Sequence, residues 1–420
     1  MTPPMFRTPP LPPVDRQVLA EIHAMRNELG HVLGTPRRWQ GMLRRGLLGR
    51  AIQGSNSIEG YYVSVEDAVA AVDDEQPLSA DQRTWAEIVG YRRALSYVLQ
   101  AASDPDFRHD PGVIRSMHFM MLSHDLSKAP GRYRLGTVYV VNEATGRVSY
   151  EAPGVERVPG LMSALAAELD AEATTDPIVR AAMAHLNLVM IHPFRDGNGR
   201  MARALQTLVL ARDSIVEAPF ASIEEWLGRN TPDYYDVLAA TGAGSWHPER
   251  DATLWVRFNL RAHHMQAQTV RRRVEQSGRL WQLLEDEISR RHLPARTAHA
   301  LFDAASGLRV RRPGYQELAD VELRTAVRDL NQLVDDGLLA AEGATRGRHY
   351  RSTPKLDELA KAARAGAAVM ADPFPALMAQ IAAHKASVSP SSAGPQPEGS
   401  GQLTTVSELL PFDTADEGGA

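Results

Sequence analysis

A glycine-rich loop between two apolar helical stretches constrains the fold of this chain more than any other feature. Asp176 followed by Pro177 is typical of a helix start, and residues 178–191 that follow are mainly apolar. The pattern predicts that this helix ends at His192. Beyond the loop, apolar residues return at helical spacing from Met201 onwards. We therefore expect a short turn that joins two helices of the core.

The loop contains residue types that suit phosphate binding. Gly197 and Gly199 can adopt backbone angles that other residues avoid, so consecutive N–H groups can converge on an anion at the start of the second helix. Arg200 and Arg203 are one turn apart and present positive charge from one face of that helix. Together these residues predict a phosphate site.

Two further side chains add chemistry to the loop. Asp196 lies beside the glycines, where a carboxylate can hold a magnesium ion that bridges phosphate oxygens. His192 is the candidate base at neutral pH. Taken separately, these residues could belong to a helix end, an ordinary turn and a solvated face. Their combination within twelve residues favours a catalytic site.

Residues 192–203 read HPFRDGNGRMAR and resemble, at every defined position, the HxFx(D/E)GN(G/K)RxxR signature of the Fic (filamentation induced by cAMP) family, whose members mostly transfer AMP from ATP to protein hydroxyls. The resemblance implies an all-α fold, a Fic helical bundle. In it, His192 would deprotonate a Ser, Thr or Tyr hydroxyl that attacks the ATP α-phosphate and releases pyrophosphate. Asp196 would hold Mg²⁺, and Phe194 would anchor the loop in the core. The ATP phosphates would be bound by Gly197, Asn198, Gly199, Arg200 and Arg203.

A predicted β-hairpin interrupts the helical pattern. Residues 137–142 and 147–150 are expected to form its strands, with residues 143–146 as the turn. By the same resemblance, this is where Fic proteins carry the flap that aligns a target segment by adding it as an extra strand. A purely structural hairpin is the alternative.

A second pattern lies at the end of an amphipathic helix near the N-terminus. Ser55 and Glu59 are one turn apart, and Gly60 is expected to cap the helix. Alone, this pattern also fits a solvated glutamate before a helix stop. Beside the loop motif it resembles the inhibitory (S/T)xxxE(G/N) helix of Fic proteins, which implies that Glu59 pairs with Arg203 and blocks the ATP γ-phosphate. In some family members the same glutamate helps to remove AMP from a modified target.

The chain length of 420 residues predicts two to three domains. Apolar residues at helical spacing dominate between two ends whose composition indicates disorder. The expected divisions are a disordered Pro-rich tail at 1–14, an N-terminal helical region with the inhibitory helix at 15–105, a Fic catalytic core at 106–245, trailing helices or a linker at 246–295, a winged helix-turn-helix at 296–355, a C-terminal helix at 356–385 and a disordered tail at 386–420.

The C-terminal module is predicted from two helices followed by two strands. The helices cover residues 315–319 and 324–336, and the strands, 338–341 and 349–351, flank a basic loop. This order resembles a winged helix-turn-helix, whose second helix can enter the DNA major groove. Such modules also serve dimerisation or docking, so both roles stay open. The basic residues that would favour DNA are Arg309, Arg311, Arg312, Arg346, Arg348 and Arg351.

Composition limits the expected cellular location and the classes of partner. The chain has no cysteine and needs no oxidising compartment to fold, so a cytoplasmic location is expected. No apolar run approaches the length of a spanning helix, so no membrane partner is expected. The net charge of −5 argues against a protein that binds nucleic acid over its whole surface.

The leading interpretation is a protein adenylyltransferase (AMPylator) that uses ATP and Mg²⁺, is inhibited through Glu59, and acts on an unknown target protein or on itself. The alternatives are a DNA-binding regulator whose Fic core senses nucleotide, a Fic enzyme that mainly removes AMP, and transfer of a different phosphate-containing group. A homodimer is also expected. An intact His192 argues against a pure sensor, because a sensor needs the phosphate loop but not the base.

Overall fold

The chain folds as a mainly helical bundle, described here by a computed structural model of residues 4–142, 147–171, 175–212, 217–344, 347–366, 368–388 and 403–407. The helices up to and including the pair that flanks the glycine-rich loop are α1 (Pro13–Leu33), α2 (Gln40–Ile58), α3 (Val65–Val72), α4 (Gln82–Ser103), α5 (Pro111–Leu122), α6 (Val158–Asp170), α7 (Pro177–Ile191) and α8 (Asn198–Ala211). The later helices are α9 (Ala218–Ala221), α10 (Glu224–Arg229), α11 (Thr231–Gly242), α12 (Thr253–Arg290), α13 (Ala298–Ala305), α14 (Arg312–Ala319), α15 (Leu323–Asp335), α16 (Pro354–Arg364) and α17 (Leu377–Val388). The expected all-α class is confirmed.

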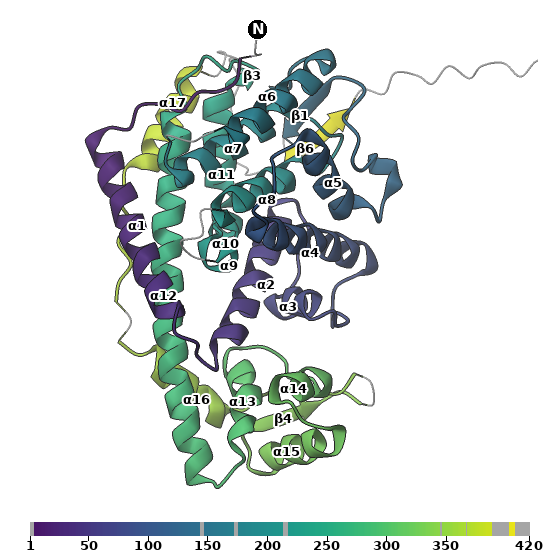
Figure 1. Cartoon of the computed structure of the whole chain (residues 1–420), viewed down its shortest axis with the longest axis vertical. Coiled ribbons are helices and arrows are strands. Elements are labelled where there is room, and N and C mark those ends of the chain that lie inside the picture. Colours follow the sequence, from purple (N-terminus) through teal and green to yellow (C-terminus); the bar gives the residue numbers. More distant parts are fainter. Residues whose placement is uncertain are drawn as a thin grey trace, which may run out of the picture.

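The centre of the bundle is formed by α7 and α8, which pack against each other (Figure 1). Asp176 caps α7 by accepting a hydrogen bond from the Ile178 N–H, and Pro177 lies in the first turn, as the sequence predicts. Nearly all residues of both helices are buried, which is the pattern of helices that lie inside a core. The loop between them is therefore held at both ends by the hydrophobic core.

One long helix connects the two ends of the molecule. α12 is a single helix of 38 residues, about 57 Å long at 1.5 Å per residue, where trailing helices or a linker were expected (Figure 1). Trp255 and Phe258 near its start belong to the core of the α7–α8 bundle, whereas Val270 and Leu284 belong to a second core around the C-terminal helices. In the described part of the chain, no helix is both long and apolar enough to cross a membrane.

Residues 4–14 are ordered, whereas a disordered tail was expected at 1–14. Phe6 is 1% exposed, and its backbone N–H donates to Asn187 Oδ1 at 2.9 Å while Asn187 Nδ2 donates back to the Phe6 carbonyl at 3.1 Å. Proline richness removes backbone donors, but one buried aromatic ring with two backbone hydrogen bonds is enough to hold this stretch against α7.

The strands form two small sheets. The first contains β1 (Val138–Asn142), β2 (Arg147–Glu151), β3 (Gly244–Ser245) and β6 (Leu403–Ser407) in the order β3-β2-β1-β6. The β1–β2 hairpin is antiparallel, which confirms the predicted hairpin, and its expected turn at 143–146 lies outside the described residues. The strand β6 lies within the region 386–420 for which disorder was expected; residues 389–402 and 408–420 lie outside the described residues. The second sheet pairs β4 (Leu339–Glu342) with β5 (His349–Ser352).

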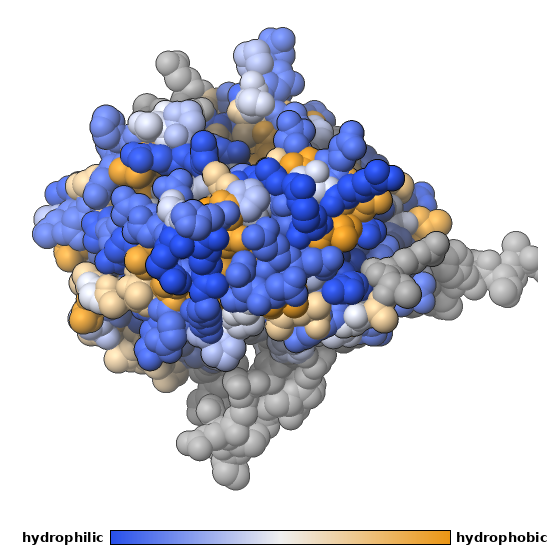
Figure 2. Space-filling model, turned by 90° about the horizontal axis from the view of Figure 1, so that it is seen from below, coloured by the Kyte–Doolittle hydropathy of each residue, from blue (hydrophilic) through white to orange (hydrophobic). Residues whose placement is uncertain are grey.

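The C-terminal module has the element order expected from the sequence, with α14 and α15 followed by the β4–β5 pair. Figure 2 shows this end of the molecule as mainly hydrophilic, with small separate hydrophobic patches. Two of its exposed apolar side chains, Leu323 and Val327, belong to α15. Its assignment as a winged helix-turn-helix stays a prediction.

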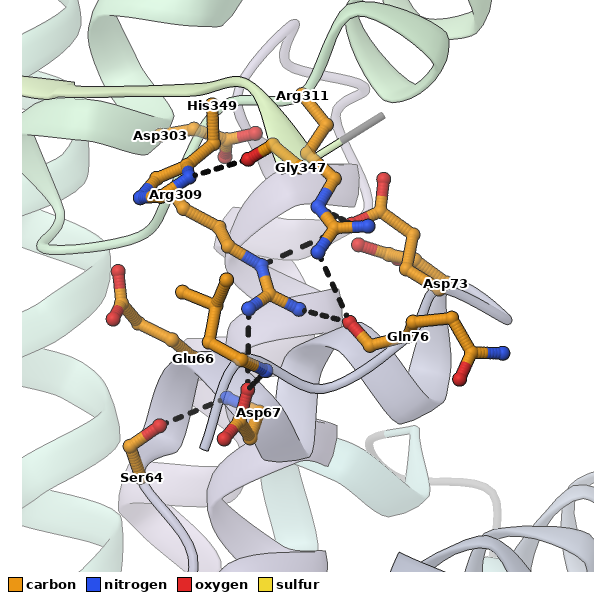
Figure 3. A network of polar contacts seen from close by, with 12 residues as sticks. Ser64, Glu66, Asp67, Asp73, Gln76, Asp303, Arg309, Arg311, Gly347 and His349 are labelled. Carbon is orange, nitrogen blue, oxygen red and sulfur yellow. Dashed lines mark hydrogen bonds and ion pairs between the residues drawn. The ribbon is translucent and has the colours of Figure 1, made fainter. Parts of the chain in front are cut away.

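Several of the basic residues counted toward DNA binding are ion-paired within the chain. Arg309 Nη1 lies 3.1 Å from Asp67 Oδ1 on α3, and Arg309 Nη2 donates to the Gln76 carbonyl (Figure 3). Arg351 pairs with Glu66, also on α3, at 2.6 Å. These contacts fasten the C-terminal module to the N-terminal helices, and they leave less basic charge for DNA than the sequence count implies. Arg346 lies outside the described residues.

Candidate functional site

The loop leaves α7 through a residue with unusual backbone geometry. His192 caps α7 with φ of +52°, a left-handed conformation that is uncommon for residues other than glycine and clusters at functional sites. Its N–H donates to the Leu188 carbonyl at 3.0 Å. Gly197 has φ of +76° and ends the loop directly before α8. These two positions reverse the chain within six residues.

The loop is braced from inside. Asn198 Oδ1 accepts from the Phe194 N–H and Asn198 Nδ2 donates to the Phe194 carbonyl, both at 2.9 Å. The Phe194 ring is fully buried, as predicted for an anchor, and stacks on His118 with ring centroids 3.8 Å apart. Asn198 is also expected to bind phosphates, and that role stays a prediction; both polar atoms of its side chain hold the loop closed.

His118, on α5, connects the loop to the segment before the hairpin. Its Nδ1 accepts from the Gly131 N–H at 2.8 Å. Its Nε2 lies 2.9 Å from the Asp196 carbonyl, which can only accept, so Nε2 carries the proton. Burial lowers the pKa of His118 to about 4, which keeps the ring neutral in this role. The sequence motif contained no sign of this residue.

His192 has a defined tautomer. Its Nδ1 lies 3.1 Å from the Val189 carbonyl, so Nδ1 carries the proton and Nε2 is the basic nitrogen. Burial lowers the pKa of His192 to about 4. At neutral pH the ring is therefore neutral. Arg134 Nε donates to the His192 carbonyl at 2.9 Å and fixes the backbone at this point.

Glu59 and Arg203 form the expected ion pair, at 2.7 Å between Glu59 Oε1 and Arg203 Nη2. The same guanidinium donates from Nε to Ser55 Oγ at 2.7 Å and from Nη2 to the Ser55 carbonyl at 2.9 Å. Burial alone would lower the pKa of Arg203, but Glu59 raises it above the ordinary value. Gly60, with φ of +83°, follows the end of α2 and lets the chain turn away.

The Glu59 carboxylate lies over the start of α8. A Cβ atom built on Gly199 would come within 2.4 Å of Glu59 Oε1, so a larger residue here would displace this carboxylate. Gly199 belongs to the first turn of α8, where backbone N–H groups lack partners within the helix and attract anions. Glu59 thus places a negative charge where the sequence predicts a phosphate.

Arg203 retains one donor that the ion pair does not use. Its Nη1 is buried and has no hydrogen-bond partner among the residues that the structure describes. An unsatisfied buried guanidinium nitrogen is costly, so this donor favours an anion that binds in the cavity beside it.

Arg200 differs from its expected position. It was predicted to point with Arg203 toward the phosphates, but it is 1% exposed and its Nη1 lies 2.6 Å from Glu87 Oε2 on α4. It does not line the cavity. Residues three apart on a helix differ by about 60° in direction, which is enough to turn Arg200 under the loop while Arg203 faces the cavity.

Asp196 is paired with a cation from outside the motif. Lys128 Nζ, at the end of the 3-10 turn η1 (Leu126–Lys128), lies 2.8 Å from Asp196 Oδ2 and 2.6 Å from Glu87 Oε1. Burial would raise the pKa of Asp196, but Arg200 and Lys128 hold it below the ordinary value. Across the described ranges, no group of three or more His, Cys, Asp or Glu is placed to hold a metal ion.

A single cavity collects most of the predicted residues. It is lined by His192, Asp196, Gly197, Asn198, Gly199, Arg203 and Glu59. Tyr234 and Tyr235 of α11 and Val140 of β1 are among the other residues of its wall. The residues that sequence reasoning missed are Glu87, Lys128, His118 and the two tyrosines, which come from separate elements and carry no local signal.

Comparison with known proteins places residues 109–210 in a match to the model of the Fic/DOC family. The chain is similar to the protein adenylyltransferase fic-1 of Caenorhabditis elegans, with 30% identity over 211 residues that cover 49% of this chain and 39% of that protein. It is also similar to the protein adenylyltransferase Fic of Nematostella vectensis, with 30% identity over 198 residues that cover 46% and 43%. The chain thus spans less than half the length of these curated relatives.

A solved structure supports the fold. The crystal structure of a Fic family protein from Desulfovibrio desulfuricans aligns with a TM-score of 0.52 and 26% identity, covering 83% of this chain and 98% of that one. The similarity therefore extends well beyond the loop, to most of the helical elements.

Proposed function

We propose, from the Fic/DOC family domain that this chain carries at residues 109–210, that the protein is an adenylyltransferase that transfers AMP from ATP to a Ser, Thr or Tyr hydroxyl of a protein. One observation carries the proposal: a single cavity is lined by neutral His192, by the first turn of α8 and by buried Arg203, whose Nη1 has no hydrogen-bond partner among the described residues. The test incubates the Glu59→Gly variant with labelled ATP and cell lysate, beside the double variant that also carries His192→Ala. Labelled protein is expected only in the first reaction.

The chemistry assigned to this chain is mainly positioning and proton transfer. The acceptor oxygen attacks the α-phosphorus and gives its proton to His192 Nε2. The bond between the α-phosphorus and the bridging oxygen breaks, and pyrophosphate leaves. The first turn of α8 and Arg203 Nη1 are placed to bind the negative charge of the triphosphate.

We propose that Mg²⁺ binds at this site through one protein carboxylate, that of Asp196. Magnesium is commonly held by one or two carboxylates together with substrate phosphates and water, so Asp196 alone is a sufficient protein ligand. The ion would neutralise phosphate charge when bound. Lys128, which now pairs with Asp196, supplies a positive charge at this carboxylate.

The Lys128 pair leads to a prediction for metal binding. In a Glu59→Gly background, Lys128→Met is expected to lower the Mg²⁺ concentration needed for half-maximal ATP binding by about two- to fivefold, because a competing partly buried ion pair is worth up to about 1 kcal/mol. Calorimetric titration of ATP at a series of Mg²⁺ concentrations measures it. Lys385→Met, which removes the pair between Lys385 of α17 and Asp236 of α11, is the control. An unchanged or higher requirement in Lys128→Met would contradict the competition.

Autoinhibition is proposed to act through Glu59. Its carboxylate uses the same helix start and the same arginine that the ATP phosphates require. A nucleotide can then be bound only in part, or in a pose that is not productive, until this carboxylate moves away.

The pH dependence follows from the burial of His192. A base must be unprotonated, and with a pKa of about 4 the ring stays neutral down to well below pH 6. In Glu59→Gly, the loss of a negative charge that favours the imidazolium acts to lower this pKa further. We expect kcat/KM to stay flat between about pH 8 and about pH 5.5, where an ordinary histidine would be mostly protonated. An acid limb centred near pH 6.5 would contradict the low pKa.

We also propose that the C-terminal module is a docking unit. Its arginines reach the N-terminal helices through Asp67 and Glu66, and Arg45 of α2 pairs with Asp303 of α13 at 2.5 Å. The helix α2, which Glu59 follows directly, is therefore fastened to this module near its other end, and this supports a role of the module in holding the inhibited state.

A further inference from the structure

A second cavity, here called the arginine cavity, lies between α2 and the end of the molecule that carries α13 and α16, beside α12 (Figure 1). Three arginines from three helices line it, namely Arg50 of α2, Arg273 of α12 and Arg364 of α16. None of the described residues in its wall also lines the cavity around His192. It is therefore a separate site with an unusual concentration of positive charge.

Arg50 has no partner of its own. Among the described residues, none forms a hydrogen bond or an ion pair with its guanidinium. The carboxylate that attracts it is Glu225, but Glu225 already bonds to Arg273 at 2.5 Å and 2.7 Å and to Arg229 at 2.6 Å. One carboxylate is thus shared among three guanidinium groups. The charge of Arg50 remains uncompensated.

The electrostatics of Arg50 agree with this geometry. The pKa of Arg50 is lowered to about 10, first by burial and then by the charge of Arg273, with further lowering by Arg229 and Arg364. The attraction of Glu225 opposes these effects and does not offset them. An anion in the cavity would relieve the repulsion between these cations, so the arrangement favours anion binding.

The carboxylate in the wall does not change this balance. Asp303 is the one acidic residue among the described residues that line the arginine cavity. Its Oδ2 lies 2.5 Å from Arg45 Nη2, and Arg45 is not part of the wall. The charge of Asp303 is therefore compensated from outside the cavity, and the three arginines keep their excess.

Apolar side chains limit the kind of anion that fits. They form much of the remaining wall, among them Leu47 of α2, Leu280 of α12 and Phe302 of α13. An inorganic ion would leave this apolar surface uncovered, whereas a ligand with an apolar body would bury it. A phosphate group carries up to two negative charges and accepts bonds from several guanidinium groups, so it matches three arginines better than a single carboxylate does.

We propose that the arginine cavity binds a small phosphate ester, with the phosphate at Arg50, Arg273 and Arg364 and the apolar part of the ligand against Leu47 and Phe302. Arg50 belongs to α2, which Glu59 follows directly, so the bound ligand would contact the helix that carries the proposed inhibition. The proposal does not depend on the transferase function, because it concerns a different cavity.

The test is a calorimetric titration of the full-length wild-type chain with phenyl phosphate and, separately, with inorganic phosphate. Phenyl phosphate is expected to bind about tenfold more tightly, because its ring covers the apolar wall. Arg50→Met should weaken its binding about 10- to 100-fold, since charge-assisted hydrogen bonds are lost. Arg44→Met is the matched control. It removes another arginine of α2, one that pairs with Glu217 outside the cavity wall, and should leave binding unchanged.

Two further variants keep the result unambiguous. Arg364→Met, on another helix of the wall, should also weaken binding, and it decides the question if Arg50→Met does not fold. Arg203→Met removes the arginine of the other cavity and should leave binding in place.

Several results would overturn the proposal. They are no binding to the wild type, unchanged binding in Arg50→Met or Arg364→Met, equal affinity for the two phosphates, or binding that only Arg203→Met abolishes. Without ligand, the melting temperature of Arg50→Met should equal or exceed that of the wild type, because the repulsion at this position is removed.

Discussion

Replacement of Glu59 by glycine is expected to raise AMP transfer about 10- to 100-fold. The carboxylate makes a charge-assisted hydrogen bond to buried Arg203, a contact worth about 1.5–3 kcal/mol, and that energy opposes every productive binding of ATP. Without it, Arg203 and the start of α8 are available to the triphosphate. Transfer of labelled AMP to lysate proteins, measured at equal enzyme concentration, gives the ratio.

Two variants show whether the effect comes from the charge. Glu59→Gln keeps the shape and can still bond to Arg203, so activation smaller than that of Glu59→Gly is expected. Ser57→Gly, near the end of α2, tests whether a glycine at the end of this helix activates the enzyme without loss of the Glu59 carboxylate. This variant should keep the wild-type activity. If Glu59→Gly is no more active than the wild type, the inhibitory role of Glu59 is wrong.

Removal of the base is expected to have a comparable or larger effect in the opposite direction. His192→Ala in the Glu59→Gly background should lower the transfer rate about 10²- to 10⁴-fold, the usual contribution of a positioned general base. Binding of ATP should change little, because no phosphate contact is assigned to the imidazole. Single-turnover rates and equilibrium binding of ATP, measured on the same preparation, separate the two quantities.

The control for this variant is a histidine outside the site. His247→Ala removes a partly exposed ring that pairs with Glu249 and does not line the cavity, so it should leave both rate and binding unchanged. A double variant lacking His192 that still transfers AMP at the rate of Glu59→Gly would exclude histidine as the base.

Much of the site could be predicted from sequence because its chemistry is local. Gly197, Gly199 and Arg203 lie in the loop and in the helix α8 that follows it directly. Their relative positions therefore depend on consecutive residues of the chain. The same holds for the α7 cap at Asp176. The pairing of Glu59 with Arg203 joins distant segments, and it was expected only through resemblance to a known family.

Other parts of the site could not be read from the chain. Glu87, Lys128 and His118 are ordinary residues in their own segments, and they acquire a role only where α4, η1 and α5 meet beneath the loop. Arg200 pairs with Glu87 beneath the loop, and spacing alone does not distinguish this position from one that faces the cavity.

By itself, the sequence determined the helical class, the hairpin and the glycine-rich loop, since each depends on periodicity or on neighbouring residues. Only the tertiary structure decided which partners these groups meet. Phe6 is held by Asn187 and β6 by β1, although composition predicted disorder at both ends. The physical reason is that composition measures the average gain from burial, whereas order at a chain end depends on whether a few residues find a complementary edge or pocket elsewhere in the fold.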